Sequence, residues 1–335
     1  MENIDSYYAE NTIPDEQTFA SFDMSNIDGI QLNDVRTIFT HNSYKTDIPS
    51  LSYSLVNLVS TDLAQEVNYS HDRLTEQLQN GVRGFELDLQ YSNGEFSIEH
   101  IPVFDNLTSC YNFELAMQEI AEWSSRNSKH VPITIMFEIK DLVPILSAGK
   151  ETIDDEGWDI LETILINVFG EENIITPADM MGDCSTLQEV ALTDSSPALS
   201  DCLGKVMFLL HPSDTDTANY IARDTTMQSQ VMIPLIYMNN DGSVDAQYED
   251  YSLFRMYNNI NAEMVGVFLD LTSQGYYIRT RMDADMEIDA TRAEQALASC
   301  AQYLSTDFEN GNLLSYTDYV ASYDDGYYIT LRYNI

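Results

Sequence analysis

Short apolar, β-branched runs recur along the chain from residue 31 onward, and stretches with a helical spacing of apolar positions separate several of them. Short apolar runs are typical of buried strands, and apolar positions at i, i+3 and i+4 are typical of helices. The sequence therefore predicts strands at residues 35–40, 82–90, 95–100, 132–140, 205–212, 231–238, 264–270, 276–281 and 301–308. It predicts helices at residues 71–80, 111–126, 153–169 and 291–300.

This alternation of strands and helices indicates parallel β-α units. Roughly eight strands favour a closed (β/α)8 TIM-type barrel, in a regular or distorted form, over an open doubly wound sheet. No glycine-rich phosphate loop follows any predicted strand. Residues 1–30 are polar and acidic and are expected to form an irregular N-terminal lead-in. Residues 31–335 are expected to form a single catalytic β/α barrel domain.

The charge of the chain restricts its partners. It has 15 Lys and Arg against 55 Asp and Glu, a net charge of −40, and the acidic residues are spread along the sequence. Such a field repels nucleic acid, which is excluded as a partner, and offers little basic surface for lipid. The start of the chain shows no basic and apolar pattern of a signal peptide. We expect a monomer.

The cysteines give little information. Cys110, Cys184, Cys202 and Cys300 form no CxxC pair, so a zinc knuckle is not indicated. Two disulfides, with Cys184–Cys202 as the local pair, and four free thiols both remain open.

Three carboxylates fall on predicted strands. Glu86 and Asp88 are two apart, so their side chains point to the same face. Glu138 follows an apolar run and shares a face with Lys140. Carboxylates aimed into a barrel need a cation, a proton or a basic side chain between them. A solvated strand and a simple Glu138–Lys140 ion pair are the structural alternatives. With Asn42 as a further oxygen donor, the set favours Ca²⁺, and Mg²⁺ less, over zinc.

Two histidines lie at the ends of predicted strands, His41 after residues 35–40 and His100 after the run 95–99. Strand C-termini gather at one face of a barrel, so residues far apart in sequence can meet there. A histidine pair can move the protons in phosphodiester cleavage, while a divalent cation and Lys140 or an arginine offset the phosphoryl charge.

Polar residues late in the chain extend this candidate site. Arg279 and Arg281 share a strand face and are candidates to bind phosphate or sugar hydroxyls, or to pair with Asp283 and Asp285. Asp307 is a candidate to bind a substrate hydroxyl or to orient His41.

With these residues identified, the chain resembles the calcium-dependent phosphatidylinositol-specific phospholipase C family, in its bacterial-type secreted branch. The matching segments follow one another from about residue 30 to 310, namely LNDVRTIFTHNSY (32–44), LTEQLQNGVRGFELDLQ (74–90), HIPVFDNLTSC (100–110), HVPITIMFEIKDL (130–142), NIITPADM (173–180), GKVMFLL (204–210), GYYIRTRMDAD (275–285) and RAEQALASCAQYLSTDF (292–308).

The resemblance implies a division of roles. The catalytic histidines of the family fall on His41 and His100, and its calcium ligands fall on Asn42, Glu86, Asp88 and Glu138. It implies an inositol phospholipid substrate, an inositol hydroxyl as internal nucleophile, transient contact with a membrane surface and a secreted or extracellular location.

Other functions remain open. FEIKD is also similar to glycerophosphodiester phosphodiesterases, although HNSY replaces the entry motif expected of them. A non-catalytic calcium-dependent binding module would be expected to lose a general acid or base position, whereas both histidines are present. A glycosidase with paired carboxylates would leave the two histidines without a role.

Overall fold

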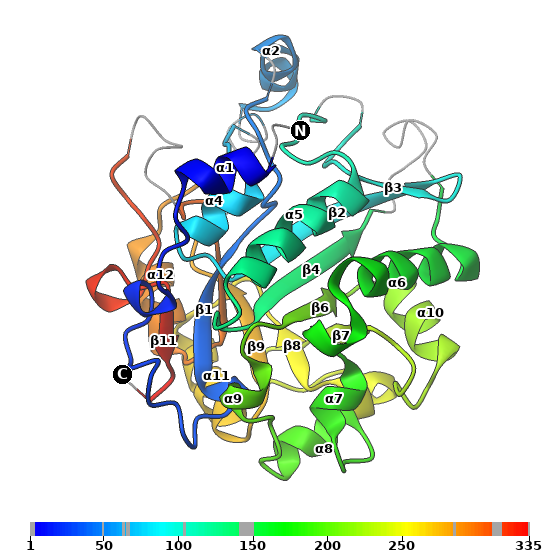
Figure 1. The fold of residues 1–335 in the computed structure, drawn as a ribbon, viewed down its shortest axis with the longest axis vertical. Coiled ribbons are helices and arrows are strands. Elements are labelled where there is room, and N and C mark those ends of the chain that lie inside the picture. Colours follow the sequence, from blue (N-terminus) through cyan, green and yellow to red (C-terminus); the bar gives the residue numbers. More distant parts are fainter. Residues whose placement is uncertain are drawn as a thin grey trace.

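Eight parallel strands close into a barrel in the computed structural model, which describes residues 4–48, 50–61, 64, 68–102, 105–140, 151–283, 286–309 and 317–333 (Figure 1). The barrel strands are β1 (Val35–Thr40), β2 (Gly84–Ser92), β4 (Ile133–Ile139), β6 (Val206–Leu210), β7 (Met232–Tyr237), β8 (Phe254–Met256), β9 (Tyr277–Arg281) and β10 (Tyr303–Thr306). They pair in this order, and β1 closes the ring by pairing with both β10 and β2. The predicted barrel is confirmed.

Three shorter strands extend the sheet. β3 (Glu95–Ile98) is antiparallel to β2, β11 (Ile329–Leu331) is antiparallel to β1, and β5 (Ile174–Ile175) runs beside β6.

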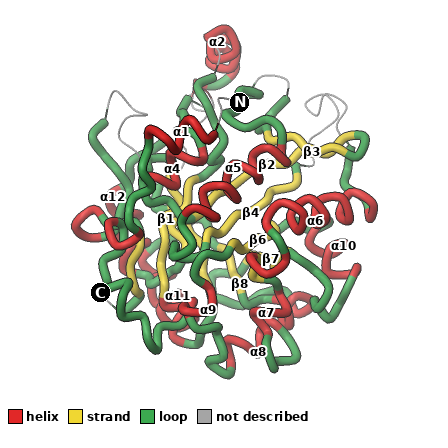
Figure 2. Tube along the Cα trace, viewed as in Figure 1, coloured by secondary structure: helices red, strands yellow, loops and turns green. Residues whose placement is uncertain are grey.

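Helices surround the strands, as Figure 2 shows. The α-helices are α1 (Ile4–Glu10), α2 (Ser50–Val59), α4 (Leu74–Gln79), α5 (Phe113–Arg126), α6 (Asp155–Phe169), α7 (Pro177–Met181), α8 (Leu187–Leu192), α9 (Leu199–Cys202), α10 (Asp216–Arg223), α11 (Ala262–Ser273) and α12 (Ala290–Ala298). Short 3-10 turns are η1 (Glu16–Thr18), η2 (Leu32–Asp34), η3 (Glu171–Asn173), η4 (Ala246–Tyr251) and η6 (Asp324–Gly326). In the described part of the chain, no helix is both long and apolar enough to cross a bilayer.

One predicted strand is wrong. Residues 264–270 lie within helix α11. Asn261 caps the start of this helix, and its side chain accepts hydrogen bonds from the backbone N–H groups of Glu263 and Met264. Met264, Phe268 and Leu271 are buried at a helical spacing, so the apolar run belongs to one helix face. The barrel strand in this region is instead β8, which has three residues with an arginine in its centre and therefore shows no apolar run.

The other predicted strands and helices are present. β1 has the predicted bounds, and the remaining elements have shifted ends. Strands β1, β2, β3, β4, β6, β7, β9 and β10 and helices α4, α5, α6 and α12 each overlap the segment predicted for them. The strands are buried along most of their length because helices cover the barrel outside and side chains fill it inside.

The N-terminal lead-in is partly ordered and contacts the barrel. It contains α1 and η1, and Ala20 forms an isolated parallel bridge with Ile329. The carboxylate of Glu16 is 3% exposed and forms an ion pair with the buried guanidinium of Arg83, the residue before β2. This buried ion pair fixes the lead-in against the base of the barrel.

All four cysteines are free thiols, so the open alternative of a Cys184–Cys202 disulfide is not realised in the structure. The expected extracellular location stays a prediction.

Candidate active site

The predicted metal-binding carboxylates form a cluster at the ends of β2 and β4. Asp88 and Glu138 are direct partners across these two strands, and Lys140 follows the end of β4. The Nζ atom of Lys140 lies 2.8 Å from Oδ2 of Asp88 and 2.8 Å from Oε1 of Glu138. The ion pair that the sequence left open is therefore present, and it includes Asp88 as well as Glu138.

Burial and charge shift the pKa values of this cluster in opposite directions. Burial raises the pKa of Asp88 to about 6, although Lys140 opposes it. Burial also raises the pKa of Glu138. The charge of Lys140 and, to a smaller extent, that of His211 outweigh burial and lower this pKa to about 2. Burial would lower the pKa of Lys140, yet the two carboxylates raise it above its ordinary value. The side chain of Lys140 therefore stays protonated and positively charged between the two carboxylates.

Glu86 belongs to the same face of β2 but has a different partner. Its Oε2 atom lies 2.6 Å from the guanidinium of Arg279, which also donates to Ser305 at 2.9 Å. Burial raises the pKa of Glu86, but Arg279 and then His41 outweigh it and hold the pKa below its usual value. Because the side chain of Arg279 is only 1% exposed, this pair lies deep in the barrel mouth.

His41 stands where β1 ends, at the edge of this cluster. Its Nδ1 atom is 2.7 Å from Oδ1 of Asp307, and its Nε2 atom is 3.2 Å from Arg281 and 4.0 Å from Glu86. Burial raises the pKa of Asp307, but the charge of His41 and the hydrogen bond to it outweigh burial and lower the pKa. Of the two roles expected for Asp307, this contact favours orienting His41.

A second, buried histidine supports the turn that carries His41. His71 Nε2 lies 2.7 Å from the carbonyl oxygen of His41, and His71 Nδ1 lies 2.7 Å from Glu309. Asn42, in this turn, has a φ of 46°, which asparagine tolerates better than most residues. Its amide N–H donates to the hydroxyl of Tyr69 at 3.0 Å, and its carbonyl oxygen, the candidate cation ligand, accepts a long hydrogen bond from the hydroxyl of Tyr44 at 3.5 Å.

His100 reaches the site by a different route from the one expected. It follows β3, which is not a barrel strand but folds back antiparallel along β2. The backbone N–H of Glu99 donates to the carbonyl of Asp88 at 3.3 Å, so the hairpin returns His100 to the level of the carboxylate cluster. The predicted strand before His100 is present, but it is antiparallel and lies outside the barrel, so His100 does not stand at the end of a barrel strand. The return of the hairpin places it beside Asp88 nevertheless.

A buried carboxylate also holds His100. Its Nδ1 atom lies 2.7 Å from Oδ2 of Asp105, whose other oxygen lies 2.6 Å from the Nζ atom of Lys45. Burial raises the pKa of Asp105, but the hydrogen bond from His100 and the charge of Lys45 outweigh it, so the pKa is lowered. The side chain of His100 remains 23% exposed, so its ring is accessible to solvent.

His211 is a site residue that the sequence reasoning missed. It follows β6, and one of its ring nitrogens, an oxygen of Glu86 and an oxygen of Glu138 all lie within 4.8 Å of one another. Burial lowers the pKa of His211, and the two glutamates oppose this only in part. The rule used for His41 and His100, a histidine at the end of a predicted strand, applies equally to His211 and would have found it.

The donor set fits a divalent cation. Oδ1 of Asp88 is buried and accepts no hydrogen bond from the described residues, so it is available to a ligand. Glu86, Asp88, Glu138 and the Asn42 carbonyl supply oxygen atoms, which suit Ca²⁺ or Mg²⁺. His211 adds a nitrogen, which is less typical of calcium.

The expected pairing of Asp283 and Asp285 with the two arginines is settled for Asp283 alone. Asp283 accepts hydrogen bonds from Thr306 and from the backbone of Asp307, rather than pairing with Arg279 or Arg281. Asp285 lies outside the described residues. Neither Asp105 nor His71 was identified from the sequence: His71 acts through Glu309, 238 positions away, and Asp105 lies on a connection whose path the sequence pattern does not show, although it is only five positions from His100.

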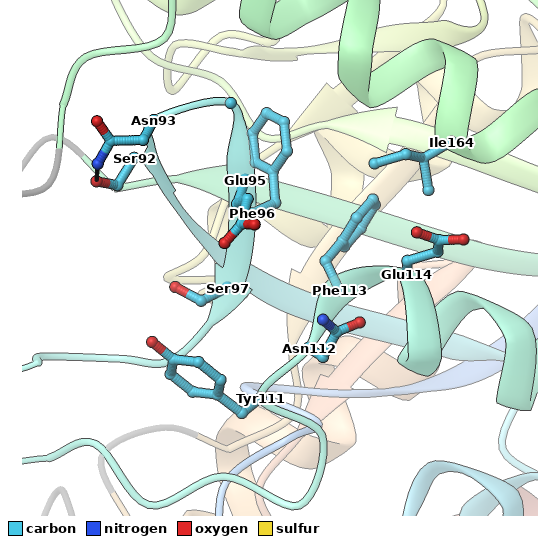
Figure 3. Close-up of a pocket in the computed structure, with 11 residues that line it drawn as sticks. Ser92, Asn93, Glu95, Phe96, Ser97, Tyr111, Asn112, Phe113, Glu114 and Ile164 are labelled. Atoms are coloured by element: carbon cyan, nitrogen blue, oxygen red, sulfur yellow. Dashed lines mark hydrogen bonds between the residues drawn. The ribbon is translucent and has the colours of Figure 1, made fainter.

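A cavity of about 430 Å³ lies away from these residues, beside the β2–β3 hairpin and the start of α5 (Figure 3). Phe96, Phe113 and Ile164 line its apolar part, and Glu95 and Glu114 lie at its border. None of the candidate site residues lines this cavity.

The barrel is the fold expected of phosphodiesterases of the phospholipase C type, and the comparison with protein families places the chain in that class. The family described as "Phosphoinositide phospholipase C, Ca2+-dependent" matches residues 30–97 and 90–333, and the chain belongs to this family. No protein with a curated description matches the sequence.

Solved structures share the fold at low sequence identity. A calcium-dependent phosphoinositol-specific phospholipase C from Pseudomonas sp. in its apo form is 16% identical, with a TM-score of 0.65 over 94% of this chain and 99% of that one. A Ca²⁺-dependent phosphatidylinositol-specific phospholipase C from Streptomyces antibioticus is 15% identical, with a TM-score of 0.59 over 83% of this chain and 94% of that one.

Proposed function

We propose that the protein is a phospholipase C that cleaves the phosphodiester of inositol phospholipids, with His41 and His100 as the proton-transferring groups. One observation carries this proposal: each histidine is held by its own buried carboxylate and borders the same carboxylate cluster. His41 pairs with Asp307 near Glu86, and His100 pairs with Asp105 near Asp88.

The paired carboxylates support proton transfer. A hydrogen bond from Nδ1 to a carboxylate fixes the ring and its tautomer, so that Nε2 faces the reacting atoms. One histidine then accepts the proton of the attacking hydroxyl, and the other donates a proton to the leaving oxygen. Arg281, 3.2 Å from Nε2 of His41, is placed to bind a phosphoryl oxygen beside that nitrogen.

The family and the oxygen donors both support calcium as the cofactor. Glu86, Asp88, Glu138 and Asn42 would hold the ion, and His211 borders the same position. When bound, Ca²⁺ supplies charge stabilisation for the phosphoryl oxygens. Lys140 holds Asp88 and Glu138 together and adds a second positive charge near the phosphate.

The substrate is tested with two phosphodiesters. We expect inositol phosphate or its cyclic form to be released from phosphatidylinositol vesicles in the presence of Ca²⁺, and chelation by EDTA to abolish the release. Turnover of glycerophosphoinositol without any release from vesicles would contradict the lipid assignment.

The assigned roles are tested by variants. His41→Ala and His100→Ala are each expected to lose catalysis while retaining calcium binding in calorimetry. Glu86→Gln and Asp88→Asn are expected to lose both. Near wild-type rates in either histidine variant would overturn the mechanism.

A further inference from the structure

Lys45 is a buried lysine for which the proposed mechanism has no role. Its side chain is 1% exposed, and its Nζ atom lies 2.6 Å from Oδ1 of Asp105, whose side chain is fully buried. The ammonium also donates to the carbonyl of Thr46 at 3.2 Å and lies 5.5 Å from the centre of the Tyr69 ring. Replacing a buried ion pair by apolar side chains is often neutral or stabilising, so stability alone does not account for this pair.

The backbone of Lys45 is fixed to the turn that carries His41. Its N–H donates to the carbonyl of Asn42 at 2.8 Å, and its carbonyl accepts the N–H of His71, also at 2.8 Å. The ring of His71 contacts the carbonyl of His41 at 2.7 Å. These contacts hold the start of the Lys45 side chain in one position relative to His41.

The far end of the same side chain reaches the partner of His100. The two oxygens of Asp105 have different partners, Oδ1 at the ammonium of Lys45 and Oδ2 at 2.7 Å from Nδ1 of His100. Two reciprocal backbone hydrogen bonds join Asp105 to Ile101, on the connection that follows His100. An antiparallel bridge joins Thr108, further along this connection, to Lys45. One lysine therefore joins the two segments that carry the histidines.

The ring of His100 needs such a support. The β2–β3 hairpin places its backbone beside Asp88, but its side chain is 23% exposed, so packing alone does not fix the ring. The carboxylate of Asp105 orients the ring only if it is itself held and ionised. Burial raises the pKa of Asp105, but the hydrogen bond from His100 and the charge of Lys45 lower it. Lys45 thus both holds one oxygen and favours the ionised carboxylate.

We propose that Lys45 is a positioning residue, which through Asp105 sets the orientation of the His100 ring and its separation from His41. This rests on the proposed function, because the two histidines then act on one phosphodiester. Proton transfer at both ends of the reacting group requires both rings in place at once, and a displacement of about 1 Å can cost roughly 100-fold in rate. Other residues bind the substrate and the metal, so the loss of Lys45 is expected to lower kcat and to leave KM.

The test compares Lys45→Met with Arg83→Met in the cleavage of a soluble short-chain phosphatidylinositol. Each variant removes a buried positive charge from a buried carboxylate, but Arg83 pairs with Glu16 of the N-terminal lead-in. We expect both variants to lose stability, and only Lys45→Met to lower kcat, by about 30-fold or more, with KM and calcium affinity unchanged within about two-fold. Lys45→Arg keeps the charge and should recover part of the rate.

Three results would overturn the proposal. The first is an equal kcat in Lys45→Met and Arg83→Met, which would make Lys45 a structural residue only. The second is a loss confined to KM, which would assign Lys45 to substrate binding. The third is a rate in Lys45→Arg no higher than that of Lys45→Met, which would show that the positive charge has no part in the effect.

A spectroscopic measurement makes the test independent of turnover. In protein with isotope-labelled histidine, the Nδ1 proton of His100 is expected to give a slowly exchanging resonance, because it lies in the hydrogen bond to Asp105. His100→Gln assigns it. The resonance should persist in Lys45→Arg and be lost in Lys45→Met, or in Lys45→Gln if Lys45→Met does not fold. A resonance that persists without the charge of Lys45 would contradict the proposal.

The same measurement separates this inference from the proposed function. If the wild type cleaves no phosphodiester, yet the His100 resonance is lost in Lys45→Met, the proposed function fails and the orientation of His100 by Lys45 stands. If the wild type is active and neither kcat nor the resonance changes in Lys45→Met, the proposed function stands and this inference fails.

Discussion

The Nδ1 atom of His41 lies 2.7 Å from Oδ1 of Asp307, across 266 positions of the sequence. We expect Asp307→Asn to lower the rate of phosphodiester cleavage roughly 100-fold or more, because an amide cannot stabilise a protonated imidazole. Calcium binding, measured by calorimetry, should be retained. A variant with a wild-type rate and pH profile would show that Asp307 is not a positioning residue for His41.

Lys140 sits between Asp88 and Glu138, where it competes with a cation for their oxygens. We expect Lys140→Met to destabilise the calcium-free protein, since the buried carboxylate of Asp88 and the partly buried carboxylate of Glu138 then lack this partner. Added Ca²⁺ should raise the melting temperature of this variant more than that of the wild type. Lys129→Met, which changes an exposed lysine, is the control and should respond like the wild type. A smaller calcium response in Lys140→Met would contradict this competition.

His211 contributes nitrogen to a donor set that otherwise consists of oxygen. We expect His211→Asn to weaken the binding of Mn²⁺ more than that of Ca²⁺, because imidazole favours transition metals. Calorimetric titration of the purified protein with each ion measures the difference. Equal losses for both ions, or no loss for either, would show that His211 is not a ligand.

The buried Arg83–Glu16 pair joins the N-terminal lead-in to the barrel. We expect Arg83→Met to lower the free energy of unfolding by about 3–5 kcal/mol, because it leaves the buried carboxylate of Glu16 unpaired. The exposed Arg126–Glu122 pair on α5 provides the control, and Arg126→Met should cost no more than about 1 kcal/mol. Urea unfolding measures the free energy of unfolding of both variants. Equal losses in the two would contradict the argument that burial makes the Arg83–Glu16 pair more important.

His130 is predicted to make the fold sensitive to acid. Burial lowers its pKa from 6.5 to about 4, and its ring contacts Ser124 at 2.8 Å and the carbonyl of Val131 at 2.6 Å. Because the folded pKa is the lower one, the stability that His130 contributes is complete above pH 6.5 and is lost as the pH falls through about 4. His130→Gln should therefore lose less melting temperature between pH 7 and pH 5 than the wild type does. If His130→Gln lost as much melting temperature as the wild type over this range, groups other than His130 would determine the sensitivity to acid.

The sequence by itself determined the barrel and the carboxylate face of β2. A spacing of two along a strand puts Glu86 and Asp88 on one side whatever surrounds them, and parallel β-α units gather the strand ends at one face. The prediction from the apolar pattern was wrong at α11, because an apolar run fits both a strand and the buried face of a helix. It missed β8, because a strand of three residues is too short to show a pattern.

Only the tertiary structure decided which charges meet. Asp307 and Glu309 reach His41 and His71 because β10 closes the ring beside β1, and the β2–β3 hairpin turns His100 back toward Asp88. No spacing along the chain encodes such contacts, because they depend on closure of the barrel and on the path of its connections. For the same reason the sequence alone could not show that the ammonium of Lys45 lies against Asp105, the partner of His100.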